Sequence, residues 1–115
     1  MSQIRDLEPK LMWGLFDEIT RVPRPSKHEE KIIAYLIDFA QKHSLAYRRD
    51  AIGNVVICRD AAKGYEDRPT LVLQSHVDMV CEKNSDVEHD FDNDPIDAYV
   101  DNGWVKARGT TLGAD

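Results

Sequence analysis

Apolar residues in the first part of the chain follow the spacing of an amphipathic helix. They recur every three to four positions, at Leu7, Leu11, Leu15, Ile19 and Val22. This period places them on one face of a helix, so we predict a first helix from about Asp6 to Arg21. The run Pro23-Arg24-Pro25 follows. Proline removes a backbone donor and disfavours the helical conformation in the residue before it, which predicts a break.

A second helix is predicted directly after this break. Ser26-Lys27-His28-Glu29 has the form of a capping box, in which the serine and glutamate side chains each accept an unpaired backbone N–H. The inner face of this helix carries Ile32, Ile33, Leu36, Ile37, Phe39 and Ala40. We therefore expect a helix that begins at Ser26 and ends near His43.

Beyond His43 the apolar pattern changes to that of extended strands. Residues 46–50 and 54–59 flank the turn sequence Ala51-Ile52-Gly53, and we predict that they pair. Residues 96–100 and 104–108 flank Asp101-Asn102-Gly103. Because Asn-Gly tolerates the positive φ angles of a tight turn, this second pair is predicted to be a β-hairpin.

A further strand is predicted for Thr70-Leu71-Val72-Leu73-Gln74-Ser75. This segment is apolar enough to be covered on both faces, which is typical of a central strand. Since the helices come first and the strands follow in mixed order, the predicted fold class is α/β, with two helices and then a mixed sheet that includes a β-hairpin.

The composition narrows the classes of protein to consider. The chain has 115 residues, with 15 Lys or Arg, 21 Asp or Glu and a formal net charge of −6, the size of one small domain or a piece of a larger one. It lacks the clustered basic residues that bind nucleic acid, and its apolar runs are too short to span a membrane. The two cysteines form no disulfide framework and no leader-like stretch opens the sequence, so we expect a cytoplasmic protein.

The most informative polar residues follow the strand predicted for residues 70–75. His76 and Asp78 are two positions apart, and side chains at i and i+2 of an extended segment project to the same side. A neutral imidazole is a good zinc ligand, and a nearby carboxylate can fix which ring nitrogen faces the metal. The pattern fits His76 as a metal ligand and Asp78 as the catalytic-site residue that orients it. From so short a motif alone, a polar loop or a buried hydrogen bond is the favoured explanation.

A second candidate ligand is Asp115, which follows Gly113-Ala114. The small residues before it would let the backbone come close to a bound group, and the two oxygens of a carboxylate can hold two cations, which lie about 3.5–4 Å apart in two-metal sites. The alternative is an acid exposed to solvent at the end of the chain.

An acidic stretch in the second half of the chain suggests calcium at first sight. Asp90, Asp92 and Asp94 have the spacing of the first three ligands of an EF-hand loop. Pro95 and Asp101 stand where that loop needs Gly and Glu, so a solvated acidic loop is favoured. A noncatalytic acidic module that binds a basic partner or calcium through this stretch is the alternative to an enzyme.

Several longer motifs resemble the aminoacyl-histidine dipeptidases, also called Xaa-His or β-alanyl-histidine dipeptidases, which are co-catalytic di-zinc metallopeptidases. The motifs lie in residues 24–30, 52–54, 74–80, 89–91, 94–96 and 104–115. The likeness covers nearly the whole chain and is most specific in Trp104 to Asp115. It implies that residues 1–115 are the N-terminal part of a catalytic domain, without the rest of that domain and without the lid or dimerisation domain.

The resemblance also implies a site and an activity. His76 would ligate one zinc ion, Asp78 would orient the imidazole and Asp115 would bridge two zinc ions, with other divalent metals as alternatives. The implied reaction is hydrolysis of Xaa-His dipeptides, such as β-alanyl-histidine, by a zinc-activated water and a glutamate general base. That glutamate and the remaining ligands would lie beyond residue 115, so we expect the 115-residue chain alone to be inactive.

The expected partner is therefore a small dipeptide, and the resemblance is compatible with a homodimer formed through the absent domain. A related metallo-deacylase or tripeptidase is the alternative within the metallohydrolases. It would share His76, Asp78 and Asp115 and would differ in pocket residues found later in the chain.

Overall fold

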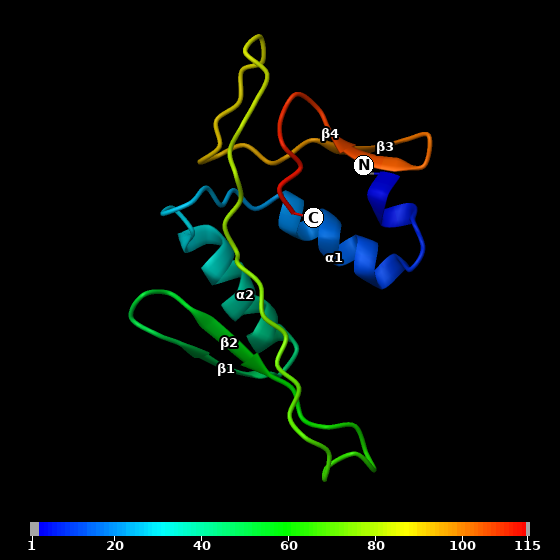
Figure 1. Cartoon of the computed structure of the whole chain (residues 1–115), viewed down its shortest axis with the longest axis vertical. Coiled ribbons are helices and arrows are strands. Elements are labelled where there is room, and N and C mark those ends of the chain that lie inside the picture. The colour runs from blue at the N-terminus through cyan, green and yellow to red at the C-terminus, as the bar shows by residue number, and fades with distance from the viewer. Residues whose placement is uncertain (1–2, 115) are drawn as a thin grey trace.

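The computed structural model describes residues 3–114 of the chain. Its elements are, in chain order, a 3-10 helix η1 (Gln3–Asp6), the helices α1 (Lys10–Thr20) and α2 (Glu30–Lys42), and the strands β1 (Ala46–Arg49), β2 (Val55–Cys58), β3 (Ala98–Asp101) and β4 (Trp104–Ala107). They extend over 54 × 36 × 22 Å, with the two helices between two small sheets (Figure 1). Within residues 3–114, no helix is long and apolar enough to cross a membrane.

The first helix is shorter than its apolar pattern predicts. η1 ends at Asp6, and α1 begins at Lys10, immediately after Pro9. Pro9 has an extended backbone, with φ −73° and ψ 129°, so the helix starts afresh after the proline. The predicted start at Asp6 is therefore wrong.

The inner face of α1 is polar rather than leucine-rich. Its buried residues are Asp17 and Thr20, whereas Leu11 is 78% exposed. The Asp17 carboxylate accepts a hydrogen bond from Nε of Arg5 and another, at 3.1 Å, from Nε of Arg21. These guanidinium groups compensate a carboxylate that would be costly to bury alone.

The second helix begins at Glu30 rather than at Ser26, so the predicted capping box is wrong. Lys27 has a φ of 70°, a left-handed conformation that a right-handed helix does not contain. The Glu29 carboxylate accepts the backbone N–H of Lys27 at 2.8 Å instead of that of Ser26. The predicted end of this helix near His43 is confirmed, since α2 ends with His43 as its C-cap.

The first hairpin packs against α2. β1 pairs with β2 in antiparallel register, from Ala46 opposite Cys58 onward, and α2 contacts both strands. Their connecting turn is held by Asp50, whose Oδ1 accepts the N–H groups of Gly53 and Asn54 at 2.8 Å each. The predicted strand pair is confirmed, and its turn has a local carboxylate that satisfies the backbone donors.

The second hairpin is also confirmed. β3 pairs with β4 in antiparallel register, with Asp101 opposite Trp104. The turn residues Asn102 and Gly103 have φ values of 48° and 81°, as the favoured two-residue hairpin turn requires. β3 packs against η1, so this hairpin lies over the 3-10 helix that precedes α1.

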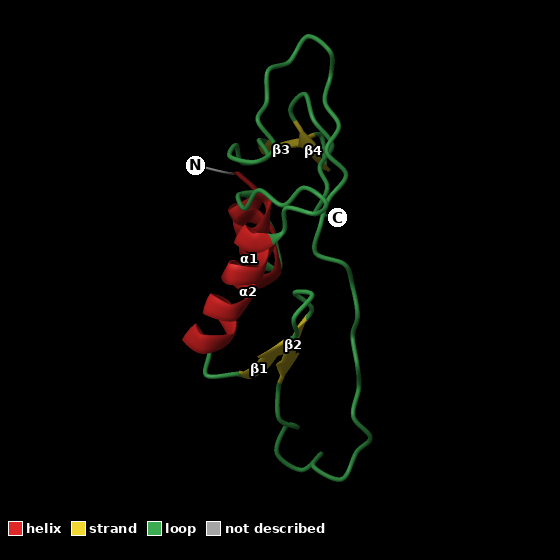
Figure 2. Cartoon of the chain, turned by 90° about the vertical axis from the view of Figure 1, so that its left-hand side faces the viewer, coloured by secondary structure: helices red, strands yellow, loops and turns green. Residues whose placement is uncertain are grey.

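Residues 70–75 do not form the predicted central strand. Among the described residues this segment pairs with no strand, and Leu71, Val72 and Leu73 are 82%, 79% and 88% exposed. The segment runs alone beside the β1–β2 hairpin (Figure 2), and it lines one side of a cavity of about 370 Å³ whose other side is β2. A central strand needs neighbours on both edges, and none is paired with this one.

The predicted mixed sheet is accordingly wrong for the described part of the chain. Residues 3–114 form two separate two-stranded sheets, β1–β2 and β3–β4, and both are antiparallel. The architecture is two helices followed by two small antiparallel sheets.

Candidate metal site

His76 and Asp78 lie where the extended segment 70–75 ends, and their side chains meet. Nδ1 of His76 lies 2.9 Å from Oδ1 of Asp78 and 2.9 Å from its backbone oxygen. The Asp78 side chain is 33% exposed and that of His76 is 81% exposed. The imidazole therefore faces open space, and the carboxylate lies partly enclosed behind it.

The contacts of the imidazole determine which ring nitrogen is free to bind a metal. Both neighbours of Nδ1 are oxygens of Asp78, one from the carboxylate and one from the backbone carbonyl, and such oxygens only accept hydrogen bonds. We therefore assign the proton of the neutral imidazole to Nδ1, which leaves the lone pair on Nε2. An exposed nitrogen with a lone pair is suited to bind zinc.

The second carboxylate oxygen of Asp78 also has a partner. Oδ2 accepts a hydrogen bond from the hydroxyl of Ser26, which lies in the break between α1 and α2. This hydrogen bond, and after it the contact with His76, hold the pKa of the Asp78 carboxyl below its usual value, because both favour the ionised form. Asp78 is thus kept as an acceptor for the imidazole N–H.

The segment that precedes Asp115 lies beside the segment that follows Asp78. The backbone N–H of Thr111 donates to the oxygen of Glu82 at 2.9 Å, and its hydroxyl donates to the oxygen of Val80 at 2.7 Å. Asp115 itself lies outside the described residues. Its bridging role stays a prediction, but the residues before it are held next to the segment that follows Asp78.

A cavity of about 260 Å³ is shared by these two segments. His76 and Asp78 line it from one segment, and Gly113 and Ala114 line it from the other. The structure therefore brings two of the three predicted site residues to the same cavity as the residues immediately before the third.

Arg24 lines this cavity and was not singled out from the sequence. It is only 4% exposed, and its guanidinium group donates to the backbone oxygen of Ile19 and, at 3.3 Å, to that of Gly113. Burial lowers the pKa of Arg24 from its usual value, although a guanidinium group keeps its charge in proteins. Arg24 thus ties the end of α1 to the segment that precedes Asp115. Its place in the motif of residues 24–30 was the only signal in the sequence.

Gly113 is expected to tolerate no side chain. Its φ is +71°, and a Cβ there would collide with Cε of Met79 and come within 3.0 Å of its Cβ. We expect Gly113→Ala to lower the free energy of unfolding by about 3 kcal/mol, because backbone strain and overpacking add. Denaturant titration measures this change.

Gly64→Ala provides the matched control. Gly64 also has a positive φ, +91°, but a Cβ there would meet nothing within 4 Å. This variant should show the backbone strain alone, about 1 kcal/mol. Equal losses for the two variants would mean that Gly113 is not closely packed against Met79.

The donor atoms present suit part of a zinc site. Nε2 of His76 can act as a ligand, and the Asp78 carboxylate supports it through the other ring nitrogen. Within residues 3–114, no group of three or more His, Cys, Asp or Glu side chains is placed to hold a metal ion. Zinc sites usually have at least three protein ligands, so a zinc site here needs ligands from outside those residues.

The acidic loop uses its carboxylates to build a turn. Oxygens of Asp90 accept the N–H of Asp92 at 3.0 Å and the side-chain amide of Asn93 at 2.7 Å. Asp94 in turn accepts the N–H of Asp90 at 2.8 Å. The carboxylates of Asp90 and Asp94 are thus engaged with their own loop, whereas that of Asp92 lies 3.4 Å from Nδ1 of His28. All three residues are exposed, in agreement with the prediction of a solvated acidic segment.

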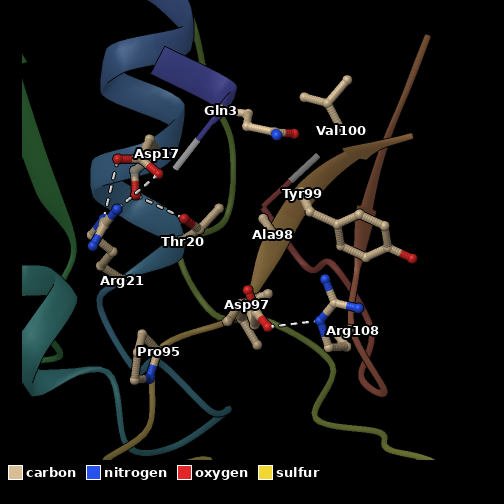
Figure 3. Close-up of a pocket in the computed structure, with 11 residues that line it drawn as sticks. Gln3, Asp17, Thr20, Arg21, Pro95, Asp97, Ala98, Tyr99, Val100 and Arg108 are labelled. Carbon is tan, nitrogen blue, oxygen red and sulfur yellow. Dashed lines mark hydrogen bonds and ion pairs between the residues drawn. The ribbon is translucent and has the colours of Figure 1, made fainter. Parts of the chain in front are cut away.

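A larger cavity, of about 680 Å³, lies away from His76, between α1 and β3 (Figure 3). Its charged lining is paired within itself, because Arg21 contacts Asp17 at 3.1 Å and Arg108 contacts Asp97 at 3.0 Å. The ring of Tyr99 adds a cation–π contact, 4.4 Å from the guanidinium of Arg108. The acids and bases in this cavity balance one another, so it offers no excess charge to a ligand.

In both fold and sequence, the chain matches part of a dipeptidase. The crystal structure of the aminoacylhistidine dipeptidase from Vibrio alginolyticus shares the fold with a TM-score of 0.95 and 48% identity, over 99% of this chain and 23% of that chain. The cytosol non-specific dipeptidase of Escherichia coli (strain K12) is 47% identical over 115 residues, which are 100% of this chain and 24% of the relative. The predicted resemblance to the aminoacyl-histidine dipeptidases is confirmed. The chain spans about a quarter of the length of these relatives, and no protein-family model matches it.

Proposed function

We propose that this chain is part of a metal-dependent dipeptidase that hydrolyses Xaa-His dipeptides such as β-alanyl-histidine. The observation that carries the proposal is the pairing of His76 Nδ1 with Asp78 at 2.9 Å, in a cavity lined also by Gly113 and Ala114. The names and the similarity of the two relatives support the same reaction class.

In this proposal the residues of the chain have distinct roles. His76 binds one of two zinc ions through Nε2, Asp78 holds the imidazole in the required tautomer, and Asp115 contributes a carboxylate to both ions. Bound zinc would supply a Lewis acid for the peptide carbonyl and lower the pKa of a bound water.

The chain would provide only a portion of the active site. It spans about a quarter of the relatives' length, and the general-base glutamate, the remaining ligands and a lid or dimerisation domain would lie in the rest of the protein. Residues 1–115 would then be a partial catalytic domain, inactive alone, and a homodimer would form through the other domain. The name of the Escherichia coli relative supports a cytoplasmic location.

The test is hydrolysis by the full-length protein that contains this chain. We expect turnover of β-alanyl-histidine that is lost on treatment with a chelator and restored by Zn²⁺. The 115-residue chain, assayed in parallel, should show none. Hydrolysis by the 115-residue chain would contradict the proposal that ligands and base lie elsewhere.

The substrate panel separates the proposal from its alternatives. Faster turnover of N-acetylated amino acids or of tripeptides than of β-alanyl-histidine would indicate a deacylase or a tripeptidase. If no substrate is hydrolysed and calorimetry detects calcium binding that depends on Asp90, the acidic-module alternative would replace the enzyme proposal.

A further inference from the structure

The break between α1 and α2 is attached to the extended segment that carries His76 and Asp78. The backbone oxygen of Arg24 accepts the N–H of Met79 at 3.0 Å, and Pro25 and Met79 form an isolated parallel bridge. These backbone contacts bring Ser26 to the side of the Asp78 carboxylate that faces away from the imidazole.

The Asp78 carboxylate is thus held at both of its oxygens. Oδ1 accepts the N–H of His76 at 2.9 Å, and Oδ2 accepts the hydroxyl of Ser26. Rotation of a carboxylate about its last side-chain bond is only weakly restricted by the side chain itself. A donor on Oδ2 therefore decides how well Oδ1 faces the imidazole.

The local backbone excludes the usual role of a serine at this position. Ser26 would cap α2 if the helix began there, but α2 has Glu29 as its N-cap and begins at Glu30. The positive φ of Lys27, 70°, separates Ser26 from the helix. The hydroxyl is consequently available to a residue 52 positions away.

We propose that Ser26 is a positioning residue of the metal site, which fixes the Asp78 carboxylate and through it the Nδ1–H tautomer of His76. The inference rests on the proposed function insofar as Nε2 of His76 binds the metal. Ser26 touches neither substrate nor metal. Its effect is transmitted along the path Ser26 hydroxyl, Asp78 carboxylate, His76 imidazole.

Two substitutions in the full-length protein test this role. Ser26→Ala removes the hydroxyl, and Ser26→Thr keeps it. In the metal-free protein, ¹⁵N NMR of the neutral His76 ring should show the Nδ1–H tautomer for wild type and Ser26→Thr, and a mixture of tautomers for Ser26→Ala. Ser85→Ala, at an exposed serine in another loop, should leave the spectrum unchanged.

Zinc affinity gives the second measurement. Competition with a chromogenic chelator should show about tenfold weaker zinc binding for Ser26→Ala, at the lower end of what substitutions behind a metal ligand cost, and near-normal binding for Ser26→Thr. An unchanged tautomer and unchanged affinity in Ser26→Ala would overturn the proposal, as would a loss that Ser26→Thr does not restore.

The same experiments distinguish this inference from the proposed function. If His76→Ala leaves zinc affinity unaltered, the metal role of His76 fails, whereas the tautomer measurement still tests the action of Ser26 on His76. If zinc binding depends on His76 and Ser26→Ala changes neither measurement, only the role of Ser26 fails.

Discussion

The His76→Ala variant of the full-length protein is expected to lose bound zinc and to hydrolyse β-alanyl-histidine on the order of a thousandfold more slowly. The imidazole nitrogen Nε2 is the ligand that the structure leaves available, because Nδ1 is engaged by Asp78 at 2.9 Å. A metal that is not held can neither polarise the carbonyl nor lower the pKa of a water. Elemental analysis of the purified variant and its kcat/KM measure the two losses.

His43→Ala is the matched control for this variant. His43 is an exposed histidine at the end of α2, in a tilted ring contact with Phe39 at a centroid distance of 4.3 Å, and it does not line the cavity of the candidate metal site. Its replacement should leave zinc content and turnover near wild type. Normal zinc content and normal turnover in His76→Ala would contradict the proposed site. Because the His76 side chain is 81% exposed, the variant should remain folded.

Replacing Asp17 by alanine is expected to lower the free energy of unfolding by about 2–4 kcal/mol. Asp17 is 2% exposed and accepts charge-assisted hydrogen bonds from Arg5 and Arg21. The substitution removes these bonds and leaves part of the α1 interface unfilled. The loss should stay below that of a fully buried pair, since the side chains of both arginines are about half exposed, at 51% and 52%, and can regain water. Denaturant titration measures the change.

Asp97→Ala removes an ion pair of similar chemistry at an exposed position. Asp97 and Arg108 contact each other at 3.0 Å with side chains 67% and 65% exposed, and such pairs contribute about 0–1 kcal/mol. We expect Asp97→Ala to change stability by no more than that. A loss as large as that of Asp17→Ala would mean that burial is not what gives Asp17 its importance.

The elements that were predicted well are those whose signals are local. The turn of the second hairpin depends on the positive φ values of Asn102 and Gly103, which their own side chains allow. The end of α2 near His43 follows likewise from a local pattern. The prediction for residues 70–75 failed because pairing depends on neighbouring strands, and no property of Leu71 or Val72 shows whether a neighbour is in place.

The prediction that the second helix begins at Ser26 failed for a related reason. Ser26 and Glu29 have the residue types of a capping box, but Ser26 forms its hydrogen bond with Asp78. A tertiary contact has replaced a local one, and a pattern of four residues cannot reveal it.

The residues of the candidate site likewise fall into those that local spacing predicts and those that depend on distant contacts. The meeting of His76 and Asp78 follows from their spacing along an extended segment. Ser26 and Arg24 could not be assigned to the site, since their partners Asp78 and Gly113 lie 52 and 89 positions away. Only the fold shows that these residues support one cavity.

The last turn of α1 is a support shared by both segments of that cavity. The buried guanidinium of Arg24 donates hydrogen bonds to the backbone oxygens of Ile19 and Gly113. The backbone oxygen of Arg24 accepts the N–H of Met79, the residue after Asp78. Fraying of this turn would loosen both segments together. By linkage, a metal that bridges the two segments must slow that fraying. Amide exchange at the end of α1, which lines the cavity through Ile19 but supplies none of the proposed ligands, would therefore report whether the site is filled.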